Sequence, residues 1–219
     1  MSQKPEQLRQ LLQVSKDGII TLNNERVILW PVSYFGNLRK DLVRNIGIKR
    51  TRGFLLRFGW DLGTNAAKQI ESLNIPIEDA IYAGSVLHTM TGYVYVEPTF
   101  INVDLDTDGS VKSVHMEGIW HNSYEAEEYI KQFGFSDTPI CHTLAGYGGG
   151  YMTTICKHPT VFKEIACRAM GDSTCRWVAK SLHLWGEEEE DYHFFDEKPI
   201  IEELNDTYEK LLEERNNLL

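Results

Sequence analysis

The chain has 219 residues, of which 42% are hydrophobic and 25% are charged, which suits a globular protein with one sizeable core or two small ones. This composition excludes disorder throughout the chain and a collagen-like structure. The formal net charge is −10, and residues 187–219 carry all of it, because they hold 13 acidic and 3 basic side chains. Residues 1–186 hold 19 of each sign. Neither part has the basic surface that phosphate-backbone binding requires, so we expect no direct contact with nucleic acid.

Targeting signals and cysteine usage bear on the compartment. No apolar stretch approaches the roughly 20 residues that a membrane helix needs, and the first residues lack the apolar region of a signal peptide. We therefore expect a cytosolic protein. In a reducing compartment the four cysteines are thiols or metal ligands rather than a disulfide framework.

The first third of the chain predicts one hairpin among helices. Strand-forming runs lie on both sides of the turn-prone Asn23 and Asn24. Ser33 is a suitable N-cap, and Gly47 separates two helical patterns. Further glycines in the second of these helices indicate close packing or a bend. The expected elements are a helix at 5–13, strands at 18–22 and 26–30, and helices at 33–46, 49–73 and 77–87.

More strands are predicted in the rest of the body, the name used here for residues 1–186. Hydropathy alternates from Gly92 onward, and the step from Asp108 to Gly109 is a strong hairpin signal. The expected elements are strands at 92–98, 100–105 and 110–120, helices at 123–133 and 143–156, and strands of a closing hairpin at 162–168 and 175–179. The fold class is therefore α+β.

The acidic tail differs from the body. Residues 187–191 have the composition of a solvated linker. Beyond them, a stripe with alternating spacings of three and four is typical of a coiled coil, interrupted by one arginine. Its members are Ile201, Leu204, Tyr208, Leu211, Arg215 and Leu218. We interpret the stripe as a truncated coiled-coil linker, with an amphipathic helix lying on the body as the alternative.

A metal site is the strongest chemical motif. Cys141, Glu164, Cys167 and Cys175 combine thiolate and carboxylate donors, and four ligands without an open position make a structural zinc site. Buried, unreactive cysteines are the alternative. Within the metal interpretation, spacing leaves open whether Cys156, His142 or His158 takes the place of Glu164.

A small-molecule pocket is the second candidate site. His88 and Trp120 both lie in apolar stretches, and together an imidazole and an indole N–H could hold the one polar atom of an apolar ligand. Ordinary core packing explains either residue equally well. The glycine-rich run at 146–151 lacks the spacing of a phosphate-binding loop. No catalytic motif is present that requires an enzyme.

Several blocks of sequence resemble one known family, the N-terminal sensory domains of bacterial sigma-54-dependent activators that respond to phenol or xylene. They include FGNLRKDL at 35–42, RTRGFLLRFG at 50–59, WHNSYE at 120–125 and EIACRAMGDSTCR at 164–176, with shorter matches at 83–88 and 139–151. The last part of the body resembles the domain named after 4-vinyl reductase. The resemblance covers nearly the whole chain.

The resemblance assigns roles to individual residues. It implies that Cys141, Glu164, Cys167 and Cys175 bind structural zinc, and that His88 and Trp120 contact the polar group of an aromatic effector. Ile81, Tyr151 and Phe162 fall where the family has further pocket walls. Ile81 and Phe162 depart from the aromatic residue and the tyrosine expected there, which predicts a roomier and less polar pocket.

The resemblance also predicts an organisation and a function. Residues 1–80 form a dimerisation region, 81–182 an effector-binding and zinc domain of the 4-vinyl reductase type, and 183–219 an acidic linker that ends in the truncated coiled coil. The expected function is sensing of a phenol, cresol, xylene or benzene, without catalysis, in control of a downstream ATPase and DNA-binding module that would bind ATP and DNA. A tetrapyrrole-handling or vinyl reductase accessory protein and a purely structural dimerisation module are the alternatives.

Overall fold

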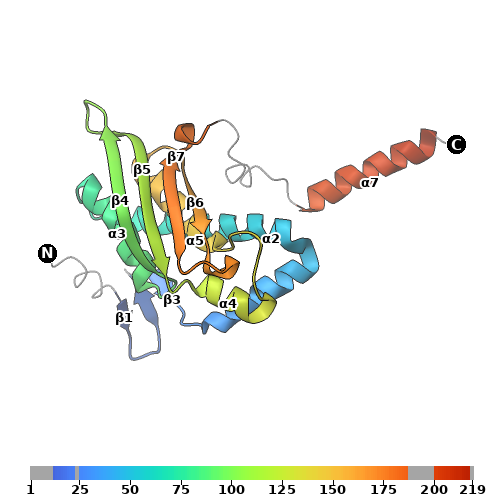
Figure 1. Cartoon of the computed structure of the whole chain (residues 1–219), viewed down its shortest axis with the longest axis horizontal. Helices are drawn as coiled ribbons and strands as arrows, with labels where there is room; N and C mark the ends of the chain where they lie inside the picture. The colour runs from blue at the N-terminus through green and yellow to red at the C-terminus, as the bar shows by residue number, and fades with distance from the viewer. Residues whose placement is uncertain (1–11, 23–24, 187–199, 218–219) are drawn as a thin grey trace.

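A computed structural model describes residues 12–22, 25–186 and 200–217 (Figure 1). Near its start lies a small antiparallel sheet made of β1 (Leu12–Val14), β2 (Ile20–Leu22) and β3 (Glu25–Val27). The predicted hairpin is thus confirmed, with shorter strands. The predicted helix at 5–13 is wrong at its described end, because residues 12–14 pair with β2, and its other residues lie outside the described part.

One long helix follows, α2 (Val32–Glu71), which is interrupted at Gly47 by a non-helical backbone with φ 80° and ψ 165°. The predicted break at this glycine is confirmed, because a positive φ favours glycine. The predicted cap at Ser33 is wrong. The helix begins at Val32, after Pro31, and no side chain caps it with a hydrogen bond.

The second sheet is antiparallel and has the order β4-β5-β7-β6. Its strands are β4 (Tyr95–Leu105), β5 (Val111–His121), β6 (Thr160–Ala166) and β7 (Cys175–Ser181). The strands predicted at 92–98 and 100–105 are one strand, because a register shift between Pro98 and Phe100 lets the pairing with β5 continue past the proline. The hairpin turn at Gly109 and the closing hairpin are confirmed.

Helices pack on one face of this sheet (Figure 1). They are α3 (Ile77–Met90) and α5 (His142–Cys156). In contrast, α4 (Tyr124–Phe133) packs against α2 and the first of two short 3-10 turns, which lie at Arg168–Met170 and Leu182–Leu184. Ser123 caps α4, since its side chain accepts a hydrogen bond from the Ala126 amide. The α+β class is confirmed, and the core lies between the sheet and α3 and α5.

Glycines bring α2 and α5 into backbone contact. A Cβ atom on Gly59 or Gly63 of α2 would lie 2.1 or 2.0 Å from the Thr143 or Tyr147 carbonyl oxygen of α5. The relation is reciprocal, because a Cβ on Gly146 of α5 would lie 2.1 Å from the Leu56 oxygen of α2. The glycines of both helices therefore serve close packing. For the helix predicted at 49–73, the sequence had indicated either close packing or a bend.

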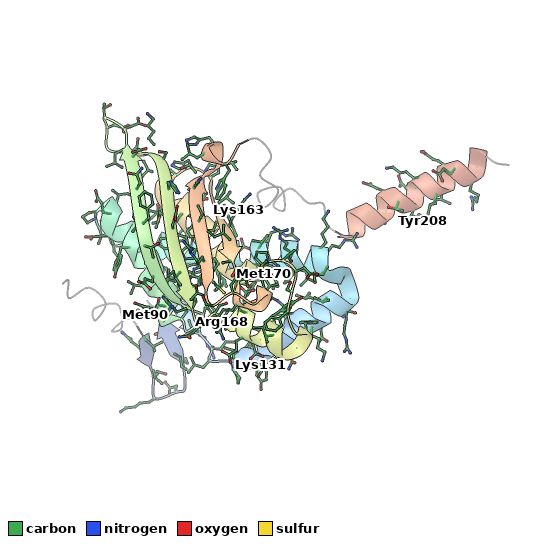
Figure 2. All side chains as sticks on the ribbon, viewed as in Figure 1. Met90, Lys131, Lys163, Arg168, Met170 and Tyr208 are labelled. Carbon is green, nitrogen blue, oxygen red and sulfur yellow. The ribbon has the colours of Figure 1, made fainter. Side chains whose placement is uncertain are left out.

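The last described element is α7 (Ile200–Asn217). Tyr208 and Leu211 of the predicted stripe are 63% and 59% exposed (Figure 2). The acidic run at 187–191 and the side chains of Ile201, Leu204 and Leu218 lie outside the described part. Among the helices of the described ranges, none combines the length and apolarity needed to cross a bilayer.

Candidate functional site

The four predicted metal ligands meet at one point. Cys141 precedes α5, Glu164 lies in β6, Cys167 follows β6, and Cys175 begins β7. One donor atom from each lies within 4.8 Å of the other three. Within the described residues, Cys156, His142 and His158 are not part of this cluster, so the geometry favours Glu164 as the fourth donor.

The cluster has the dimensions of a tetrahedral zinc site. The sulfur of Cys175 lies 3.8 Å from that of Cys141 and 4.0 Å from that of Cys167. A Zn–S bond of about 2.3 Å in tetrahedral geometry places two sulfurs about 3.8 Å apart. In addition, Glu164 Oε1 is buried and has no hydrogen-bond partner among the described residues. Its free lone pairs are what a cation would use, so the residues fit a zinc ion.

The ionisation of the cluster also points to a cation. Burial, reinforced by the Cys167 charge, raises the pKa of Glu164 to about 8. Burial raises the pKa of the Cys141 thiol, whereas hydrogen bonds from the Cys141 and Cys175 thiols lower the pKa of Cys167. These hydrogen bonds favour the thiolate form of Cys167, and burial favours the thiol form of Cys141. A divalent ion would stabilise the further thiolates that zinc binding requires.

Neighbouring polar groups hold the ligands in place. Ser123 Oγ lies 3.0 Å from Cys141 Sγ, and the Cys141 amide donates to Glu164 Oε2 at 2.9 Å. Asp172 Oδ2 accepts a hydrogen bond of 2.8 Å from the Cys167 amide in the loop that carries Arg168 (Figure 2). Such outer contacts orient metal ligands before the metal arrives.

A cavity of about 30 Å³ lies between α3, α5 and the inner face of the sheet. Four of the five predicted pocket residues line it, namely His88, Trp120, Ile81 and Phe162. The remaining lining residues are Gly84, Ser85, Val96, Met116, Leu144, Tyr147, Gly148, Met152 and Trp177. The structure therefore brings His88 and Trp120 to one apolar enclosure.

The fifth predicted residue, Tyr151, does not line this cavity in the described structure. Its hydroxyl donates to the Ala80 carbonyl oxygen at 2.6 Å. Its ring lies against α3, where a Cβ on Gly84 would come within 2.4 Å of it. A direct contact between Tyr151 and a ligand stays a prediction.

His88 is a neutral hydrogen-bonding group in this cavity. The side chain is buried, and burial lowers its pKa to about 3. The ring stacks on Tyr147 with a centroid distance of 4.0 Å and an interplanar angle of 19°. A neutral imidazole donates one hydrogen bond and accepts another, so it can pair with a hydroxyl group without introducing a charge.

Sequence reasoning missed two polar residues of the cavity, Tyr147 and Trp177. Tyr147 Oη and Trp177 Nε1 are buried, and neither has a hydrogen-bond partner among the described residues. A signal existed for the second one, because strand periodicity places Trp177 on the same face as Cys175 and Ala179. The position of the Trp177 ring also requires glycine at residue 118, because a Cβ atom on Gly118 would lie 2.3 Å from that ring.

Large aromatic rings pack beside the cavity. The Tyr147 ring stacks on His88, and the Trp177 ring packs 5.0 Å from that of Phe162. A pocket roomier and less polar than that of the phenol sensors stays a prediction.

Two family models and several relatives match the chain. The model for the activator of aromatic catabolism family matches residues 7–104, and the model for the 4-vinyl reductase domain matches residues 120–181. The phenol regulator MopR of Acinetobacter guillouiae is 32% identical over 192 residues, covering 87% of this chain and 34% of that protein. These matches are to the N-terminal sensory domain of phenol- and xylene-responsive activators.

Further comparisons agree with this family of sensory domains. The transcriptional regulatory protein XylR of Pseudomonas putida is 28% identical over 211 residues, covering 95% of this chain and 37% of that protein. The crystal structure of the phenol-responsive sensory domain of the transcription activator PoxR with phenol matches with a TM-score of 0.82 and 27% identity, covering 91% of this chain and all of that one. The chain spans about a third of the length of the two curated relatives.

Proposed function

We propose that this sensory domain binds a small aromatic effector of the phenol, cresol, xylene or benzene type in the cavity between α3, α5 and the sheet. The observation that carries the proposal is that His88 and Trp120 lie in the wall of one buried, largely apolar cavity. Such a cavity with few polar groups suits a ring that bears one hydroxyl. The PoxR domain, which shares the fold, was crystallised with phenol.

Effector binding requires the cavity to enlarge. An engineered apolar cavity that binds benzene measures about 150 Å³, whereas this one measures about 30 Å³ and would hold about two water molecules. An aromatic effector would therefore select a form in which α5 and its tyrosines move away from the sheet. This difference between the two forms is what a regulator needs in order to convert occupancy into a signal. The same small volume argues against a tetrapyrrole ligand.

The rest of the regulatory assembly is part of the same proposal. Effector binding would control a downstream ATPase and DNA-binding module in the cytosol, through a linker at 183–219 that ends in a coiled coil containing Tyr208 and Leu211. Residues 1–80 would form a homodimer or a higher homo-oligomer. Exposed apolar side chains in that region support this role, since monomeric proteins rarely expose so many together. They include Val14, Ile28, Leu29, Trp30 and Tyr34.

The metal cluster would hold a structural zinc ion, and the domain would carry out no chemistry of its own. Bound zinc would join the start of α5 to the hairpin of β6 and β7 through four protein ligands. Because no coordination position is left for a substrate, its contribution is to folding and rigidity.

Isothermal titration of phenol, cresols, xylenes and benzene into the purified protein tests the effector proposal. We expect saturable binding of at least one of them, and His88→Ala should weaken phenol binding about tenfold because a buried hydrogen bond is lost. His183→Ala, at an exposed histidine, is the matched control and should bind as the wild type does. The absence of saturable binding for all of them would rule out the aromatic sensor, and unchanged phenol affinity in His88→Ala would remove His88 from the site.

A further inference from the structure

The start of α5 lacks the cap that most helices have. The N-cap position is Cys141, whose side chain makes no capping hydrogen bond, and the first turn contains no acidic residue. The Cys141 sulfur instead lies in the metal cluster. Because the first amides of a helix have no partner within the helix, another part of the chain must supply an acceptor.

Glu125 of α4 supplies that acceptor. Its Oε1 accepts a hydrogen bond of 3.0 Å from the Leu144 amide, and Thr143 also donates to its carboxylate. These are the second and third residues of α5, the positions that an N-cap side chain normally serves. Glu125 is 2% exposed, so no bulk water competes for these hydrogen bonds.

Arg39 of α2 completes the arrangement. Its Nη2 pairs with Glu125 Oε2 and also donates to the Ile140 carbonyl oxygen at 3.0 Å. Its side chain is 8% exposed. The pair therefore bonds to the residue directly before Cys141 and to the residues two and three positions after it, and it ties both points to α2.

We propose that Arg39 and Glu125 are positioning residues that cap α5 from outside and thereby hold Cys141 in the cluster and Tyr147 against His88. The proposal rests on the proposed zinc and effector sites. Glycine contacts set the distance between α2 and α5. The Arg39–Glu125 pair sets where along α2 the first turn of α5 lies, and therefore where the residues that follow it are placed.

Two double variants test this role without leaving an uncompensated buried charge. Arg39→Gln with Glu125→Gln keeps an amide oxygen for α5 and an amide donor for Ile140, whereas Arg39→Leu with Glu125→Leu keeps neither. Glu71→Gln breaks an ion pair with Lys157 at the opposite end of the same two helices and is the matched control. Zinc affinity is measured by competition with a chromophoric chelator, phenol affinity by calorimetry and folding stability by urea titration.

The leucine pair should weaken zinc binding about tenfold or more, the glutamine pair should recover most of that loss, and Glu71→Gln should leave zinc affinity unchanged. Where phenol binds the wild type, its affinity should rise in the leucine pair, because Tyr147 then leaves its stack on His88 more easily. A merely structural role would lower the free energy of unfolding while leaving the zinc affinity of the folded protein within about twofold of wild type, and that result would overturn the proposal.

Two further outcomes are also decisive. Equal losses of zinc affinity in the leucine and glutamine pairs would overturn the capping role, because the glutamine pair keeps the hydrogen bonds. If the leucine pair does not fold, the glutamine pair alone decides, with about threefold weaker zinc binding expected and an unchanged affinity contradicting the proposal. Failure of the wild type to bind phenol would reject the proposed effector function, while the zinc comparison would still test the positioning role.

Discussion

The metal cluster and the cavity share α5, β6 and β7, yet they differ in how complete they are. The four donor atoms of the cluster already lie within 4.8 Å of one another. The cavity is smaller than an aromatic ring requires, and two polar atoms beside it, Tyr147 Oη and Trp177 Nε1, have no partner in the described part of the chain. Under the proposed function, the difference corresponds to a preformed metal site next to a binding site that must adapt.

Removing a metal ligand should have the largest effect. We expect Cys175→Ser to lose zinc and to lower the free energy of unfolding by about 4 kcal/mol or more, because a structural zinc site contributes directly to folding. Elemental analysis and urea titration measure the two quantities. Cys156→Ala, at a buried cysteine outside the cluster, should keep zinc. A wild-type protein with less than about half an ion per chain would refute the four-ligand site.

A methyl group between α2 and α5 should have the next largest effect. Gly63→Ala would place its Cβ 2.0 Å from the Tyr147 carbonyl oxygen, so the two helices must separate. We expect a loss of about 3 kcal/mol in unfolding free energy. Gly148→Ala meets the movable Phe162 ring at 2.7 Å and should cost about 1 kcal/mol. Equal losses of unfolding free energy in Gly63→Ala and Gly148→Ala would show that the backbone contact at Gly63 is no tighter than the ring contact at Gly148.

The pH dependence of stability should report the buried neutral His88. Burial lowers its folded pKa to about 3, below the ordinary value of 6.5, so the unfolded chain binds more protons between these pH values. Its contribution is complete above pH 6.5 and is lost as the pH falls toward 3, with a slope of up to about 1.4 kcal/mol per pH unit.

His88→Leu should therefore flatten the acid side of the stability curve. The exposed His183→Gln is its control and should leave the curve unchanged. Urea titrations at a series of pH values give both curves. The same slope in His88→Leu and wild type would show that His88 is not held neutral by burial.

The smallest effect is expected for Tyr147→Phe. This change removes a buried hydroxyl that has no partner in the described residues, so the free energy of unfolding should rise by about 1 kcal/mol or stay unchanged. Thermal unfolding measures the change. A loss of more than about 1 kcal/mol would show that the hydroxyl is hydrogen-bonded in the folded protein.

Local signals predicted much of the fold. Gly47 marked the break in α2, Ser123 the start of α4, and Gly109 the turn between β4 and β5, because each satisfies a backbone requirement within a few residues. The cap predicted at Ser33 is a local error, because the helix begins after Pro31. The other errors arose where distant pairing decides the outcome. β1 is a strand because β2 lies beside it, and β4 continues past Pro98 because β5 pairs on both sides.

The candidate site shows the same limit. Cysteine chemistry and family resemblance together found the cluster, and His88 and Trp120 line one cavity. The pair of Arg39 and Glu125 was not predicted, since its partners are 86 residues apart and each looks like an ordinary charge on a helix. The size of the cavity likewise depends on how several rings pack together.

The central claim is that an aromatic effector enlarges the cavity while the metal cluster stays as it is. A crystal structure of the zinc-loaded protein with phenol tests this most directly. We predict phenol between α5 and the sheet with its hydroxyl hydrogen-bonded to His88, Tyr147 displaced from its stack on His88, and the four metal ligands unmoved. Phenol bound elsewhere, or a cluster rearranged on binding, would contradict the account.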